Sequence, residues 1–287
     1  MENNEKEESF SVIQQDWDEG IKIPDLANAL VKASDILFAD ALIVAGKRKG
    51  IIARNLKKEK AEEMVNHLKT LGVNTFIVSE SKLIKIPKSF KITKFSCLSD
   101  SILISLDPGN KVYPVKWENI LAISCGYVKQ IIKDKNLSLG EAFGGILGKH
   151  IPYLPVSGAV GVSIAFPMAA KSWTAENEST EKVDYLLLMD IIIKDPVARF
   201  RIESKHFAYV ELGPKMKSDT FNNFKEIIRE IVSHSPQACL GKGVEAFLGK
   251  EDKSQKITFQ SLEEFDRYDA WLTQKSVYGP KQLEKNL

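Results

Sequence analysis

The residue types best suited to chemistry in this 287-residue sequence are two groups of cations. The turn Lys47-Arg48-Lys49 lies between Gly46 and Gly50 and concentrates three positive charges. Farther along, five lysines recur at every third position: Lys82, Lys85, Lys88, Lys91 and Lys94. Each group fits two interpretations, a solvated surface or edge kept soluble by its charge, or a surface that binds an anionic partner.

The spacing of the five lysines has a geometric meaning. A flat strand would scatter them over both faces, because its side chains alternate every two residues. A polyproline-like stretch has three residues per turn, so all five would share one side, and Pro87 permits that geometry. The functional interpretation is a track for an anionic surface.

The overall charge of +2 conceals a strong asymmetry. Residues 1–46 carry 3 basic and 10 acidic side chains, whereas residues 47–94 carry 13 basic and 4 acidic ones. Either the two stretches neutralise each other within one domain, or a basic face meets an anionic partner such as a membrane surface.

Composition and motifs argue against several function classes. The 44% hydrophobic and 27% charged residues are ordinary for a globular protein and exclude a disordered, collagen-like or multi-span membrane chain. Three scattered cysteines suit neither a disulfide scaffold nor a zinc cage. Phosphate-loop, nucleophile-elbow and metalloprotease patterns are absent, so we expect no enzyme, metal or cofactor. The exception is the glycine-rich segment Gly144–His150, a candidate for an unrecognised active site. Arginine is scarce beside lysine, and aromatic residues barely interleave with the lysines, so nucleic acid is not an expected partner.

The elements that must position these residues form two expected modules. Residues 1–19 suggest a flexible acidic leader. Residues 20–86 suggest a small helix-backed sheet with helices at 24–38 and 57–71 and strands at 41–45, 51–55 and 73–78. The stretch "LKTLGVNTFIV" resembles small ferredoxin-like βαβ modules, such as sporulation-related repeats.

After Pro87 the pattern changes to strand-length runs closed by a helix. Seven strands are expected at 90–97, 101–106, 111–117, 120–128, 185–194, 198–203 and 207–212, followed by an amphipathic helix at 219–233. The segment "YPVKWENILAI" (Tyr113–Ile123) and the closing helix resemble the bacterial pleckstrin-homology-like domains over about residues 88–235. The resemblance implies a seven-stranded antiparallel sheet or barrel plugged by the helix.

The same resemblance bears on ligands. Lipid-binding members carry basic residues on their first strand and an arginine on their second. Here Lys91 and Lys94 lie on the first expected strand, but the second carries no basic residue, which argues against phosphoinositide binding there. A groove beside the closing helix is the expected partner site, with Phe221, Phe224 and Ile228 as candidates.

Two further segments complete the expectations. The insertion 129–182 contains twenty uncharged residues, 151–170, whose prolines and glycines argue against a membrane span. It could form an apolar flap, a partner-inserted loop or a membrane contact. The tail 236–287 contains a capping box, Ser261 to Glu264, and a helix expected at 261–273. That helix would dock on the protein's own core or in another chain's groove.

Together these features predict an α+β protein of two modules, cytoplasmic because no signal peptide opens the chain. The favoured function is a non-enzymatic adaptor that recognises a protein or peptide. The alternative is peripheral association with an anionic membrane through the basic 47–94 region and the apolar insertion.

Overall fold

The computed structural model describes residues 8–34, 36–106, 111–133, 181–249 and 258–280. The chain divides into two compact units, of which the first comprises Met1–Lys129 with Tyr185–Leu287 and the second Gln130–Asp184. The second unit covers nearly the same residues as the expected insertion 129–182. Both expected modules belong to the first unit, and the fold is α+β as predicted.

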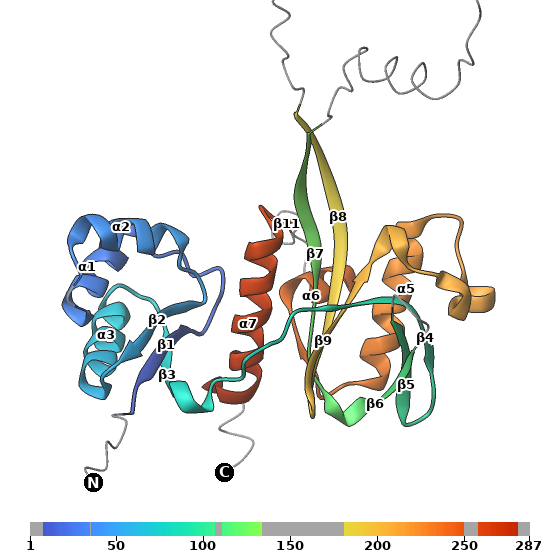
Figure 1. Ribbon diagram of the computed structural model, residues 1–287, viewed down its shortest axis with the longest axis horizontal. Coiled ribbons are helices and arrows are strands. Elements are labelled where there is room, and N and C mark those ends of the chain that lie inside the picture. The colour runs from blue at the N-terminus through green and yellow to red at the C-terminus, as the bar shows by residue number, and fades with distance from the viewer. Residues whose placement is uncertain (1–7, 35, 107–110, 134–180, 250–257, 281–287) are drawn as a thin grey trace, which may run out of the picture. The chain divides into compact units, whose positions relative to one another are not determined.

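The small sheet contains β1 (Phe10–Gln14), β2 (Ile51–Leu56) and β3 (Thr75–Ser79) in the order β2-β1-β3, and both pairings are antiparallel. Three helices pack with it: α1 (Ile23–Ala33), α2 (Phe38–Lys47) and α3 (Lys58–Thr70). Their apolar residues share one core with β1 and β2, so the module has its own hydrophobic interior. Figure 1 shows the three helices together with this sheet.

Two expectations for this module are wrong. The supposed leader 1–19 contains β1, the central strand, in which Val12 and Ile13 are fully buried. The expected strand 41–45 is part of helix α2, where Ala41 and Ala45 face the core one turn apart. A short apolar run does not distinguish a strand from a buried helix segment. The strand between β2 and β3 comes from the N-terminal stretch instead.

The large sheet joins the two expected blocks of strands. One block is β4 (Phe90–Cys97), β5 (Ser101–Leu106) and β6 (Val112–Lys116), and the other is β7 (Ile120–Lys133), β8 (Glu181–Lys194) and β9 (Val197–Glu203). They meet where β4 pairs with β9, and β10 (Cys239–Leu240) and β11 (Thr258–Phe259) add short pairings to β7. The β4–β9 pair is parallel, which corrects the fully antiparallel expectation.

The expected seventh strand at 207–212 is also wrong. Its residues 209–212 belong to a 3-10 turn, η4 (Tyr209–Lys215), and another 3-10 turn, η3 (Ser204–His206), ends directly before the segment. Phe207 and Leu212 are buried, which explains their strand-like apolar pattern. The Tyr209 hydroxyl donates to the carbonyl of Ser204 at 2.8 Å and holds the turns folded back on themselves.

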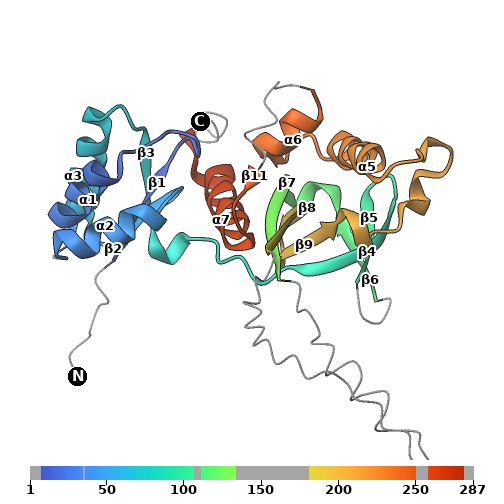
Figure 2. The ribbon, with the colours of Figure 1, turned by 90° about the horizontal axis from the view of Figure 1, so that it is seen from above.

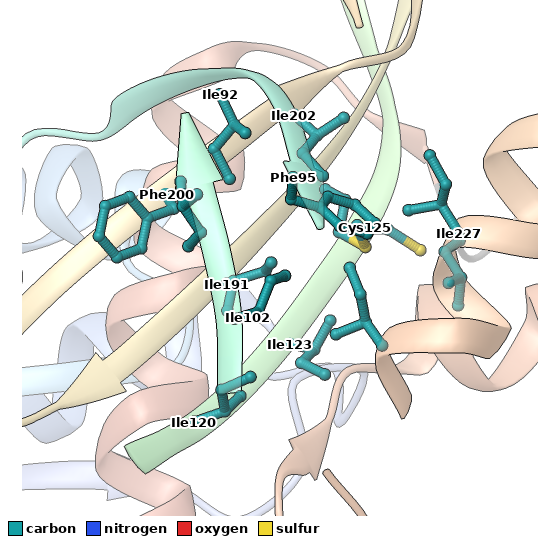
Figure 3. Close-up of a cluster of buried hydrophobic side chains, with 14 of the residues drawn as sticks. Ile92, Phe95, Ile102, Ile120, Ile123, Cys125, Ile191, Phe200, Ile202 and Ile227 are labelled. Atoms are coloured by element: carbon teal, nitrogen blue, oxygen red, sulfur yellow. The ribbon is translucent and has the colours of Figure 1, made fainter. Parts of the chain in front are cut away.

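Both faces of the large sheet are covered at β7 and β8. On one face, helix α5 (Thr220–His234) packs against strand side chains, and Figure 3 shows Ile227 of this helix with residues of the strands. Asp219 caps α5 by accepting from the Asn222 amide at 2.8 Å, as its sequence indicates. Alternate residues of β8 reach the two faces, Met189 on the α5 side and Leu188 on the other. This two-sided burial explains the nearly continuous apolar run of β8.

The other face packs against helix α7 (Leu262–Tyr278). Its apolar residues share a third core with side chains of β1, β3, β7 and β8. The helix contributes Phe265, Tyr268, Trp271 and Leu272, and the strands contribute Ile13, Val78, Ala122, Val128, Leu188 and Ile192. The views in Figures 1 and 2 place α7 between the small and large sheets. The tail helix therefore docks on the protein's own core. Ser261 caps it by accepting from the Glu264 amide at 3.1 Å, and the Glu264 side chain accepts from the Gln260 amide at 2.8 Å, one residue before the cap. Helix α6 (Lys242–Phe247) was not expected.

In the part of the chain that the structure describes, no helix combines the length and apolar composition needed to cross a membrane.

Candidate anion-binding site

The basic turn after α2 is held firmly by the residues beneath it. The Gly50 amide donates to the Gln14 side-chain oxygen at 2.8 Å, and the Gln14 amide donates to the Gly50 carbonyl at 2.8 Å. Gly50 has a φ of +79°, and a Cβ there would lie 2.6 Å from Trp17 and 2.8 Å from Trp271. Lys49 lies over the Trp17 ring, 4.9 Å from its centre. The turn is therefore a packed structure and not a solvated hairpin tip.

This turn forms one wall of a pocket of about 350 Å³ between the end of α2, strand β2 and helix α7. Five cationic residues line it: Lys47, Arg48, Lys49, Arg54 and Arg267. The remaining walls are apolar, from Val44, Ile51 and Ala270. We call this hollow, with its eight lining residues, the basic pocket. It combines concentrated positive charge with apolar walls, which strengthens electrostatic attraction inside it.

The charges of the basic pocket are poorly compensated. Among the described residues, no carboxylate lies within ion-pair distance of Lys47, Arg48, Lys49 or Arg54. Partial burial, followed by repulsion from Arg54, lowers the pKa of Arg48 below its usual value. Arg267 pairs with Glu263 at 3.3 Å, but its Nε atom is buried and has no acceptor in the described chain.

The acidic residues beside Trp17 do not supply the missing counter-charges. Asp16 and Asp18 accept hydrogen bonds from Lys242 of α6 at 2.6 and 2.7 Å. Glu19 accepts from the amide of Asn74 at 3.0 Å. The described acids next to Trp17 therefore fix α6 and the start of β3 to the small module, and the expectation that they neutralise the basic stretch is not met at the basic pocket.

The five spaced lysines lie outside the basic pocket. All are exposed: Lys82, Lys85, Lys88, Lys91 and Lys94. The segment between β3 and β4 that bears the first three is fixed to α7, because Gln274 exchanges hydrogen bonds with the backbone of Ile84 at 2.8 and 3.2 Å. Lys91 pairs with Glu203 at 2.7 Å. The structure thus separates the two groups of cations that the sequence placed in one basic region.

A hollow lies beside the closing helix, but none of the three predicted groove residues, Phe221, Phe224 and Ile228, lines it. Phe224 and Ile228 are fully buried in the core, and only Phe221 is exposed. A hollow of about 170 Å³ lies between α5, β4 and the 3-10 turns, and its lining includes Phe95, Cys97, Phe207, Tyr209, Leu212 and Ile227. Burial, followed by the charge of Glu230, raises the pKa of Cys97 to about 12, so its thiol stays protonated and is a poor nucleophile.

A buried charge cluster joins α7 to the large sheet. Arg201 of β9 donates from Nε to Asp190 of β8 at 2.7 Å and from Nη2 to Asp266 of α7 at 2.7 Å. Arg199 donates from Nη1 to Asp266 at 2.8 Å and to Asp269 at 3.2 Å. The three carboxylates lie close enough together to hold a metal ion, but the guanidinium groups already occupy them. The cluster's chemistry is ion pairing.

The sequence patterns did not lead us to expect this cluster, although a signal exists. Asp190 interrupts the apolar run "LLLMDIII" of β8, and a charged residue in such a run indicates a buried partner. The register places Asp190 opposite Arg201. The α7 partners lie far along the chain, and no local pattern indicates them.

The candidate segment Gly144–His150 and the twenty uncharged residues of the insertion lie outside the described residues. No protein-family model, curated protein or solved structure matches this chain.

Proposed function

We propose that this protein is a non-enzymatic binding protein that associates peripherally with an anionic membrane surface. The observation that carries the proposal is the basic pocket, in which five cationic side chains line one hollow and four of them lack a carboxylate partner in the described chain. Each lysine or arginine near an anionic membrane contributes about 1 kcal/mol of attraction. Several together suffice for stable, salt-dependent association.

Exposed apolar residues on α2 and directly before it support a membrane partner. Leu37, Phe38 and Ile43 are exposed by 75%, 45% and 61%. Ile43 and Lys47 lie four residues apart on the helix and therefore share a face. Cationic and large apolar side chains on one surface are the composition of elements that lie in the membrane interface.

Vesicle sedimentation tests the proposal. The full-length protein should sediment with phosphatidylglycerol vesicles at low salt, less at moderate salt, and not with phosphatidylcholine vesicles. The double variant Lys47→Gln/Arg54→Gln should lose most of the binding. The matched control Lys85→Gln/Lys88→Gln removes the same charge from exposed lysines outside the pocket and should retain it.

Three results would count against the proposal. One is an absence of binding at low salt. Another is equal loss in both double variants, which would indicate attraction by net charge alone. The third is that Lys85→Gln/Lys88→Gln loses vesicle binding and remains in the supernatant. That result would indicate that the lysine series, and not the basic pocket, binds the membrane.

A second candidate is the recognition of a protein or peptide partner, with the protein acting as an adaptor. The hollow between α5, β4 and the 3-10 turns supports it, together with the exposed side chains of Val210 in η4, Met216 directly after η4 and Phe221 in α5. A photo-reactive residue at position 221 should cross-link a partner from a lysate, and the same residue at position 118 serves as control. Identical products at both positions would remove this candidate.

A further inference from the structure

We infer that the basic pocket is a site for a phosphate monoester group, carried by a lipid headgroup or by a soluble phosphorylated molecule. The inference rests on the proposed function for its location and adds the chemistry of the ligand. Three guanidinium groups, from Arg48, Arg54 and Arg267, line the pocket beside two ammonium groups. A guanidinium forms two parallel hydrogen bonds to phosphate oxygens, whereas an ammonium acts as a point charge.

The amount of charge favours a monoester over other anions. A phosphate monoester carries about −1.5 to −2 at neutral pH and presents three strong acceptor oxygens. A carboxylate or a phosphodiester carries a single negative charge. Five cations surround the hollow, and Glu263 is the one carboxylate paired with any of them among the described residues. A doubly charged ligand compensates more of this excess than a singly charged one.

The size of the pocket also points to a ligand of this kind. The volume of about 350 Å³ falls within the range of small-molecule sites, roughly 300–1,000 Å³, and Val44, Ile51 and Ala270 provide apolar walls for the body that carries the phosphate.

A titration followed by backbone amide NMR tests the ligand chemistry. Glycerol 3-phosphate should shift the amides of residues 46–54 at low salt. Because the second pKa of a monoester is about 6, its affinity should rise roughly tenfold between pH 5 and pH 7.5. Sulfate stays doubly charged over this range and should show no comparable rise. Dimethyl phosphate, a diester, should bind more weakly than the monoester at pH 7.5.

Variants localise the effect. Arg54 is exposed, so Arg54→Gln should leave the fold intact and weaken glycerol 3-phosphate binding on the order of 10- to 100-fold, as expected for loss of a charge-assisted hydrogen bond. Lys85→Gln, with the same change in charge, should bind like the parent. The inference is overturned by the absence of binding, by equal affinity for the diester, by an identical pH response of sulfate, or by equal weakening in both variants.

Vesicles distinguish the two sources of the phosphate and separate this inference from the proposed function. Binding to phosphatidic acid vesicles above phosphatidylglycerol vesicles, with displacement by glycerol 3-phosphate, assigns the monoester to a lipid. Binding of glycerol 3-phosphate without vesicle binding assigns it to a soluble molecule, and then the proposed function fails while this inference stands. Equal binding to both vesicle types, with no shift on adding glycerol 3-phosphate, leaves the proposed function standing and overturns this inference.

Discussion

The position of the basic turn depends on a glycine that no other residue can replace at low cost. Gly50 adopts a left-handed φ of +79°, and a Cβ there would lie 2.6 Å from the Trp17 ring and 2.8 Å from Cβ of Trp271. Both backbone strain and a steric clash therefore oppose a side chain at this position.

We predict that Gly50→Ala destabilises the protein by about 2–6 kcal/mol, because strain and overpacking each cost about 1–3 kcal/mol. Urea denaturation measures the effect. The matched control is Gly72→Ala, because Gly72 has nearly the same φ, +78°, but nothing within 4 Å of the added Cβ. The control should cost about 1 kcal/mol. Equal losses would show that the two tryptophans do not confine Gly50.

Among individual residues, the sequence predicted part of the basic pocket. Lys47, Arg48 and Lys49 are consecutive and bounded by glycines, so their charge is visible in the chain itself. Arg54 and Arg267 were not predicted, because each is a single cation within an unremarkable strand or helix pattern. Only the docking of α7 beside the basic turn brings them together, and no local periodicity encodes that contact.

At the scale of the elements, helix α7 is joined to the large sheet by a cluster of charged side chains, and burial disfavours their charged forms. Three carboxylates meet two guanidinium groups, and Asp269 is completely buried. That burial, followed by the nearby Asp190 carboxylate, raises the pKa of Asp269 well above its usual range, even though Arg199 lies beside it. The native state therefore keeps a proton on Asp269 at pH values where the unfolded chain releases it.

We predict that this proton makes stability pH-dependent. A raised folded-state pKa means that the contribution of Asp269 is fully present below pH 4 and decreases as the pH rises through the folded-state pKa. The stability difference between the parent and Asp269→Asn should therefore shift against the parent as pH rises from 4.5 to 8, by at most about 1.4 kcal/mol per pH unit. Urea denaturation across this range measures it.

The matched control for this series is Glu118→Gln, which removes an exposed carboxylate on η2 (Trp117–Asn119) outside the cluster and should change stability little at any pH. If the free energy of unfolding of the parent minus that of Asp269→Asn instead grows with pH, then Asp269 is ionised and stabilised by Arg199. That result would contradict the predicted loss of stability with rising pH.

Helix α2 offers a separate prediction for membrane binding. Asp40 is exposed and precedes Ile43 by three residues and Lys47 by seven, so it shares their face of the helix. Asp40→Asn should strengthen sedimentation with phosphatidylglycerol vesicles about fivefold, because one charge near the surface contributes about 1 kcal/mol. Glu118→Gln makes the same change in net charge on another element and should have a smaller effect. Equal gains would indicate that α2 does not face the membrane.

Elements bounded by clear turn residues were predicted well from sequence. The strands Phe90–Cys97 and Ser101–Leu106 have the predicted bounds. The failures share a physical cause, which is that distant partners decide the state of a short apolar run. Phe10–Gln14 becomes a strand because β2 and β3 pair with both its edges. In the segment 207–212, Phe207 and Leu212 are instead buried in the core shared by α5 and the large sheet.

For the first unit as a whole, α7 is the element through which the small sheet and the large sheet share a core. Trp271 is 1% exposed and donates from Nε1 to the carbonyl of Gln14 in β1 at 2.8 Å. Its neighbours on α7 reach the other sheet, where Phe265 and Leu272 share a core with Leu188 and other residues of β7 and β8. Cooperative unfolding of both sheets should therefore depend on this helix.

We predict that Trp271→Ala uncouples the two sheets. Truncating a buried tryptophan costs about 3–5 kcal/mol, and here the Gln14 carbonyl also loses its donor. Native-state hydrogen exchange should show equal opening free energies for β1 and β8 amides in the parent but a larger loss at β1 in the variant. Phe224→Ala removes a buried ring from the core between α5 and the large sheet. In this variant the opening free energy should fall more at β8 amides than at β1 amides. Equal losses at both strands in Trp271→Ala would mean that the sheets remain joined through the remaining apolar contacts of their shared core, and that Trp271 stabilises the unit without coupling its parts.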